Sequence, residues 1–171
     1  MTETPANVRI ALAREGSAAV ATGLPVLDHL VAQLAVAARL DLTLEVAPGT
    51  AGEEVVGAGR ALGSALAARF EAGRGWAVVP ADEALALAAL ERADEGRFVT
   101  NVDFSDERVG GVGTDVASRF LHELAHAAGL NLHVRLVEGT DPQHVLAAIF
   151  KAVGAALGQA CRPVTDPKEV T

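Results

Sequence analysis

The stretch that decides the fold runs from Gly23 to Gly63 and reads GLPVLDHLVAQLAVAARLDLTLEVAPGTAGEEVVGAGRALG. A second stretch, from Gly113 to Val153, reads GTDVASRFLHELAHAAGLNLHVRLVEGTDPQHVLAAIFKAV and matches the first without a gap at an offset of 90 residues. The paired positions include turn residues and alternating leucines: Gly23 with Gly113, Gly49-Thr50 with Gly139-Thr140, and Leu40 and Leu42 with Leu130 and Leu132. Because these pairs place turns and strands at equivalent points, the sequence predicts a module present in two copies.

Each copy is predicted to hold strands, a helix, one more strand and a second helix. In the first copy, alternation over 8–13 and a Glu-Gly turn before 18–22 predict a hairpin. The spacing of apolar residues then predicts a helix over 25–38, a strand over 40–46 and a helix over 53–70. The second copy repeats this order, with strands within 76–104, a helix over 114–128, a strand over 130–137 and a helix over 142–161. For 82–91 the residue propensities favour a helix, whereas the place in the repeat favours a strand.

The composition predicts one compact domain, with modules at 1–73 and 74–162 and a loose tail at 163–171. Of 171 residues, 50% are hydrophobic, which is ample for a buried core. The longest apolar run, 84–90, falls short of the roughly 18 residues that a membrane span needs, and the polar start suggests a cytoplasmic protein. The lone Cys161 excludes an intrachain disulfide, and a net charge of −8 argues against nucleic-acid binding.

One short motif suggests metal chemistry. His122-Glu123-Leu124-Ala125-His126 spells H-E-x-x-H, in which two histidines on one helix face bind zinc and the glutamate activates a water. The extended zinc-peptidase form needs a third ligand where Leu132 stands. His122 and His126 also match Ala32 and Val36 of the first copy, so the shared frame is a packing frame. We therefore interpret them as surface or interface histidines, with a zinc-dependent hydrolase as the alternative.

Four blocks together resemble the imidazoleglycerol-phosphate dehydratase family. They are TGLPVLDHL at 22–30, PADEAL at 80–85, GLNLH at 129–133 and FKA at 150–152, in the family's order. The family is itself an internal duplication. The resemblance implies an α+β fold of β-β-β-α-β-α-type modules, with antiparallel sheets and helices packed on one side. It also implies a homo-oligomer built from trimers, up to a 24-subunit shell.

The resemblance further implies a di-manganese site with eight ligand positions, and this chain departs from most of them. In the family, each module supplies a lone histidine and, on the next helix, an H-H-x-x-E segment. Two histidines, His29 and His144, stand at such positions here. The other six positions hold Gly52, Glu53, Val56, Arg119, Gln143 and Ala147. Arg119 adds positive charge to a metal position. Manganese binding is therefore expected to be weak or absent.

The positions that handle the substrate in the family are better retained. By resemblance, Glu3 matches a catalytic glutamate, and Arg97 matches an arginine that contacts the phosphate of a small phosphorylated metabolite. Lys151 matches the lysine of the family's E-A-x-F-K-A block and is a candidate substrate-binding residue. The family's C-terminal phosphate-binding segment has no counterpart. Each residue also has a structural interpretation: His29 as a packing residue near its helix start, Arg97 as a solvated turn residue, and Lys151 as a surface lysine. Asp82 and Glu83 are expected to serve a turn or a subunit contact.

These observations lead to one functional hypothesis with two alternatives. The chain is expected to be a divergent family member linked to histidine biosynthesis, with weak or no dehydratase activity. The first alternative is a non-catalytic paralogue that binds a phosphorylated metabolite or assembles with an active enzyme. The second is the zinc-dependent hydrolase of the H-E-x-x-H segment.

Overall fold

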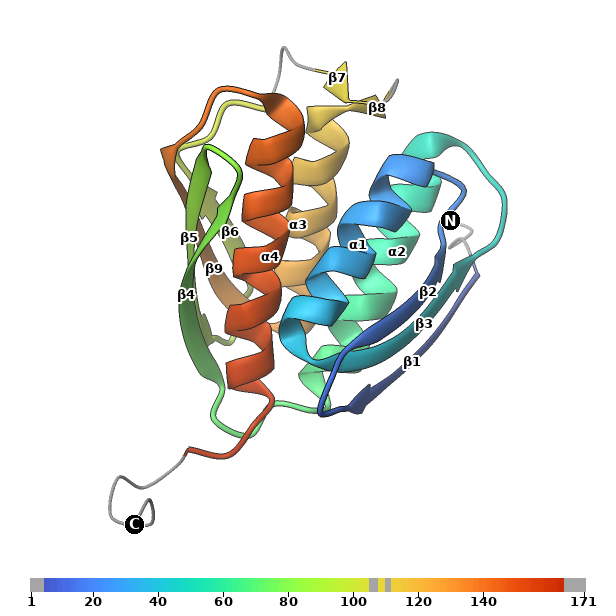
Figure 1. Cartoon of the computed structure of the whole chain (residues 1–171). Helices are drawn as coiled ribbons and strands as arrows, with labels where there is room; N and C mark the ends of the chain where they lie inside the picture. Colours follow the sequence, from blue (N-terminus) through green and yellow to red (C-terminus); the bar gives the residue numbers. More distant parts are fainter. Residues whose placement is uncertain (1–4, 105–107, 110–111, 165–171) are drawn as a thin grey trace.

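Two β-sheets enclose two layers of helices (Figure 1). The computed structural model describes residues 5–104, 108–109 and 112–164. Helices α1 (Pro25–Ala38) and α2 (Ala51–Ala67) cover the sheet formed by the first half of the chain, and α3 (Thr114–Ala128) and α4 (Pro142–Ala160) cover the other sheet. Each sheet therefore has helices on one face only, and the predicted α+β fold class is confirmed.

The first sheet has the order β1-β3-β2, with β1 (Ala6–Leu12), β2 (Ser17–Ala21) and β3 (Leu40–Val46). The predicted hairpin is wrong, because β3 lies between β1 and β2, antiparallel to the first and parallel to the second. Leu40, Leu42, Leu44 and Val46 are all buried, whereas β1 buries only Ile10. The central place in the sheet thus goes to the strand that has the most apolar surface to bury.

The second sheet has the order β4-β5-β9-β6, with β4 (Arg74–Ala81), β5 (Ala84–Arg92), β6 (Arg97–Thr100) and β9 (Leu130–Glu138). Here β6 runs parallel to β9, so both sheets are mixed and not wholly antiparallel as expected. The ambiguous segment 82–91 is a tight turn followed by strand β5, and Asp82 adopts a positive φ of 51° in that turn. A short pair, β7 (Arg108–Val109) and β8 (Val112–Gly113), precedes α3.

All four helices begin at the same end of the molecule, the upper end in Figure 1. The predicted bounds of α1 and α3 are confirmed. Helix α2 begins at Ala51, two residues earlier than predicted, because Thr50 and Glu53 form a reciprocal capping box. Helix α4 begins at Pro142, as predicted, after Asp141 caps the backbone N–H groups of Gln143 and His144. No helix in the described part of the chain is long and apolar enough to cross a membrane.

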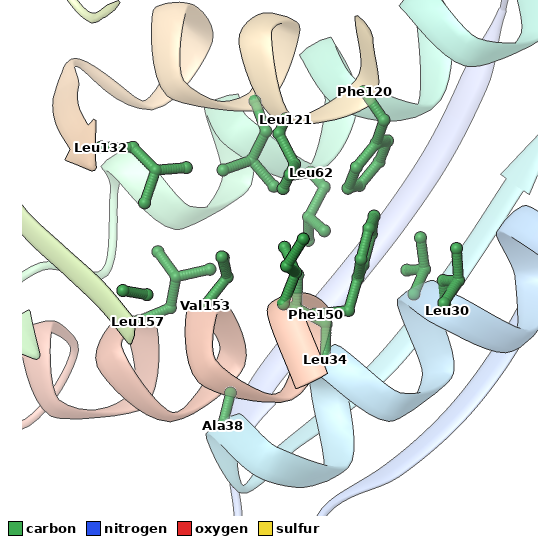
Figure 2. Close-up of a cluster of buried hydrophobic side chains, with 14 of the residues drawn as sticks. Leu30, Leu34, Ala38, Leu62, Phe120, Leu121, Leu132, Phe150, Val153 and Leu157 are labelled. Carbon is green, nitrogen blue, oxygen red and sulfur yellow. The ribbon is translucent and has the colours of Figure 1, made fainter. Parts of the chain in front are cut away.

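Glycines let helices from the two halves of the chain approach closely. Helix α4 packs on α1, where a Cβ on Gly154 would lie 2.2 Å from the carbonyl oxygen of Leu34, and one on Gly158 would lie 2.4 Å from that of Ala38. Helix α2 packs on α3 through Gly59 and Gly63 in the same way. A stacked pair, Phe120 and Phe150, joins the two helix pairs with ring centroids 5.8 Å apart (Figure 2).

We expect Gly154→Val to destabilise the fold by about 1–3 kcal/mol, because the added side chain would push α4 away from the backbone of α1. Gly52→Ala is the matched control. A Cβ at Gly52 meets only a guanidinium nitrogen of Arg119, at 3.4 Å, so this helical substitution should be neutral or stabilise by about 0.5–1 kcal/mol. Urea unfolding of both variants measures the difference, and equal stabilities would contradict the close-packing argument.

Candidate functional site

The loop that enters α1 is fixed by a buried threonine. Thr22 is fully buried, and Asp28 accepts hydrogen bonds from its backbone N–H at 2.8 Å and its hydroxyl at 2.5 Å. Between them, Gly23 has a φ of +91°, and a Cβ there would clash with the carboxylate of Glu54. Only glycine fits both the conformation and the space. The entry to α1 is thereby held against the first turn of α2.

Glu54 is a buried carboxylate at this junction. Only 8% of its surface is exposed, and within the described residues its carboxylate makes no hydrogen bond or ion pair. Glu54 stands beside the Glu53 ligand position, and it points toward Gly23.

His29 is exposed in the second turn of α1. Its Nε2 lies 3.2 Å from Nε2 of Gln33, one turn further along the helix. No other side chain among the described residues is bonded to it. The structure therefore leaves this imidazole accessible, without the further ligands that a metal would need.

His144 is held by two carboxylates from the β4–β5 turn. Its Nδ1 lies 2.5 Å from Glu83, and its Nε2 lies 3.4 Å from Asp82. Glu83 also accepts the backbone N–H of Asp141, and this bond, together with that of His144, lowers the pKa of Glu83 to about 2. The hydrogen bond to Glu83 in turn raises the pKa of His144. Asp82 and Glu83 thus serve the turn, as expected, and tie it to the start of α4.

Two of the substituted ligand positions lie side by side. One guanidinium nitrogen of Arg119 on α3 is 3.4 Å from the place that a Cβ of Gly52 on α2 would occupy. The described residues contain no group of three or more His, Cys, Asp or Glu side chains arranged to hold a metal ion. Manganese favours several oxygen and imidazole donors around one point. Within one chain, the described residues at these positions place an arginine near a glycine and a histidine against two carboxylates.

The H-E-x-x-H segment lies on α3 with both histidines exposed. Glu123, which would activate the water of a zinc hydrolase, accepts a hydrogen bond from Arg60 at 3.0 Å. Leu124 and Ala125 between the histidines are fully buried. This arrangement agrees with a packing helix that carries His122 and His126 on its outer side.

The remaining candidate residues do not gather at this end within one chain. Arg97 starts β6 and pairs with Asn131 at the start of β9, which puts it at the end where the helices finish. Lys151 lies half-buried midway along α4. Glu3 lies outside the described residues.

Sequence reasoning missed two features of this region. The pairing of His144 with Glu83 had a partial signal, because Glu83 falls in the PADEAL block and His144 stands at a ligand position of the family. The nearness of Arg119 to Gly52 had no signal in the sequence, because it arises only when α3 packs on α2 in the folded chain. The pocket that these two residues line also includes Ser118 and Thr100.

We expect the imidazole of His144 to titrate above 6.5, and its pKa to fall in Glu83→Gln. The raised histidine pKa stabilises the fold below about pH 6.5 and loses this effect as the pH rises through the folded-state value. The lowered pKa of Glu83 stabilises the folded state above about pH 4.5. This stabilisation is lost as the pH falls toward 2. NMR titration measures the pKa of His144 in the unmodified protein and in Glu83→Gln, with the signal of His133 as the internal control. An unchanged His144 titration in the variant would contradict the ion pair.

The chain folds into two mixed sheets around four helices, with candidate side chains at the helix starts. Solved structures of dehydratases share this α+β fold. The structure of imidazoleglycerol-phosphate dehydratase from Staphylococcus aureus superposes with a TM-score of 0.83 at 26% identity, covering 93% of this chain and 94% of that one. The Pyrococcus furiosus structure gives a TM-score of 0.84 at 22% identity, covering 99% and 96%, which supports the fold alone.

Sequence comparison narrows the class to a family. The imidazoleglycerol-phosphate dehydratase family model matches residues 22–157. The dehydratase of Desulforudis audaxviator is 36% identical over 168 residues, covering 94% of this chain and 86% of that relative. The Metallosphaera sedula dehydratase is 34% identical over 167 residues, covering 93% and 86%. The chain belongs to the imidazoleglycerol-phosphate dehydratase family, which links it to histidine biosynthesis.

Proposed function

We propose that this chain binds a small phosphorylated metabolite of the kind its family handles, with little or no dehydratase activity by itself. The observation that carries the proposal is the place of Arg119, whose guanidinium nitrogen lies 3.4 Å from where a Cβ of Gly52 would stand. An exposed guanidinium stands where the family resemblance implies a metal ligand, and the neighbouring ligand position, Gly52, offers no donor side chain. When bound, the family's manganese would stabilise the imidazole of the substrate as an anion, and the residues here do not supply its ligands.

The phosphate-handling side chains support the binding half of this proposal. Arg97 is exposed at the start of β6, and neither it nor Lys151 has a hydrogen bond or ion pair within the described residues. Both cations are thus available to an anionic group. A guanidinium binds phosphate oxygens in a bidentate manner, and a lysine contributes a point charge. Since the two residues lie on different elements far apart in one chain, we assign them to a phosphate site shared between copies.

The main test measures manganese and activity together. After purification with added Mn²⁺, we expect fewer than two tightly bound ions per chain by elemental analysis. Loss of metal stabilisation should lower kcat/KM for imidazoleglycerol phosphate about 10³-fold or more, relative to the Staphylococcus aureus dehydratase as control. Two stoichiometric Mn²⁺ ions per chain, together with a rate like that of the control, would overturn the proposal and restore a full dehydratase.

A non-catalytic paralogue that assembles with an active enzyme is the second candidate, and the packing frame favours it. Leu34, Leu124 and Leu132 are fully buried and Leu42 nearly so, although most ligand positions have changed. These side chains fill the core of one chain, so the fold is kept although most ligand positions depart from the family's pattern. Co-purification with an active dehydratase from the same cell would distinguish the paralogue from a stand-alone protein.

We also propose that the chain forms a homo-oligomer of at least three copies. The outer face of the second sheet exposes Trp76 (66%) and Val78 (43%) on β4, beside Leu87 and Ala89 of β5. The exposed His133 and Arg135 of β9 separate these residues from Val99 (42%) on β6. The equivalent face of the first sheet carries Arg9, Asp41, Thr43 and Glu45 instead. Large exposed apolar patches mark interaction surfaces.

Light scattering should therefore give a mass at least three times the 17.5 kDa of one chain at micromolar concentration. Trp76→Glu should shift the population toward smaller species, because it places a charge in the patch. Thr43→Glu, on the outer face of the first sheet, is the control and should leave the mass unchanged. A monomer in the unmodified protein would refute the proposal.

A further inference from the structure

Strand β4 is the outermost strand of the second sheet, and one side of its backbone faces away from β5 (Figure 1). A two-residue turn joins Ala81 to Ala84, so this pair and every second pair along the strand carry the hydrogen bonds to β5. Trp76, Val78 and Pro80 alternate with the bonded positions. Their backbone polar groups therefore point to the open side, where another extended chain could pair with them.

The side chain of Gln159 closes this open side at Trp76. Its amide nitrogen donates to the carbonyl oxygen of Trp76 at 2.8 Å, and its amide oxygen accepts the backbone N–H of Trp76 at 3.1 Å. One side chain thus makes both hydrogen bonds that a neighbouring strand would make at this residue.

The close approach of α4 to β4 brings Gln159 to the edge. A Cβ on Gly75 would collide with the carbonyl oxygen of Ala156, so glycine lets the helix lie directly against the strand. Gln159 follows three residues later, in the last turn of α4. Its position is therefore set by backbone packing between the helix and the strand.

A proline limits the same edge on the other side of Val78. Pro80 has no N–H to offer to a pairing strand, and proline within sheets is found at such edges. Val78 thus stands between the position bonded by Gln159 and the position without a donor. An incoming strand would find a complete pair of backbone groups at Val78 alone among these three residues.

The first half of the chain has a matching contact at the equivalent position of the repeat. Arg69 stands 90 residues before Gln159, and its Nη2 donates to the carbonyl oxygen of Ile10 at 3.0 Å. Ile10 lies on β1, the outermost strand of the first sheet. It faces the open side, because Ala13, three residues later, bonds toward β3 through the carbonyl oxygen of Arg39. Two chemically different side chains at one repeat position therefore both bond the backbone of an outermost strand.

We propose that Gln159 and Arg69 are edge caps, which keep β4 and β1 from pairing with the same strands of other copies of this chain. The cap matters most at β4, because Trp76 and Val78 also expose apolar side chains there. An exposed apolar edge strand is a template for pairing between copies and for aggregation. Association between copies is then confined to other surfaces, such as the outer face of the second sheet.

Gln159→Ala tests the cap at β4, and Gln143→Ala is the matched control. Gln143 is an exposed glutamine on the same helix, and within the described residues its side chain makes no hydrogen bond. Hydrogen exchange at the Trp76 amide should be about fivefold faster or more in Gln159→Ala, since its N–H loses its acceptor. During incubation well below the unfolding midpoint, light scattering should show the mass of Gln159→Ala growing severalfold faster than that of the control.

A second substitution shows whether this growth uses the β4 edge. Val78→Pro removes the N–H that faces the open side and breaks no bond to β5. Added to Gln159→Ala, it should return the growth to the rate of the control while the Trp76 amide still exchanges fast. Val78→Lys, which places a charge on the edge, serves the same purpose if circular dichroism shows that the proline variant does not fold.

Two outcomes would overturn the inference. If Gln159→Ala grows no faster than Gln143→Ala, Gln159 only ties α4 to β4. If it grows faster but neither substitution at Val78 suppresses the growth, the copies associate through another surface or through unfolded chains.

Discussion

Close packing of helices across the two halves of the chain sets the geometry on which everything else depends. Gly154 and Gly158 let the backbone of α4 approach α1, and Gly59 and Gly63 do the same for α2 on α3. The first helix of each half therefore pairs with the second helix of the other half. Neither half can bury its helices alone, and the candidate residues at the helix starts are positioned by contacts between halves.

This packing between the two halves explains why the bounds of several helices and strands could be predicted from the sequence, whereas the strand order could not. The periodic leucines predicted α1, β3, α3 and β9 closely, because apolar spacing depends on local geometry alone. The predicted hairpin failed because the alternation in β1 and β2 is the same whether they pair directly or accept β3 between them. The strand order depends on which strand takes the buried central position of the sheet. That choice involves residues more than 20 positions apart in the sequence.

The candidate site shows the same limit more sharply. His29 and His144 were found from the family's ligand positions, yet their surroundings were not predicted. His144 is bound by Asp82 and Glu83, which lie about 60 residues earlier, and this contact turns a candidate metal ligand into part of a turn-to-helix clamp. The arrangement of Arg119 against Gly52 likewise depends on α2 packing on α3. A motif identifies residue types, whereas tertiary packing decides which of their atoms remain free.

The opposite end of the helices shows why the fold can survive a changed site. There, Arg162 donates hydrogen bonds to the carbonyl oxygens of Ala38 and Gly158, at the ends of α1 and α4, and to those of Ala13 and Arg39. These bonds satisfy backbone groups that helix ends leave open, and they join both halves far from the candidate residues. Because the hydrogen bonds of Arg162 and the glycine contacts lie away from the helix starts, a substitution at the helix starts leaves these contacts in place.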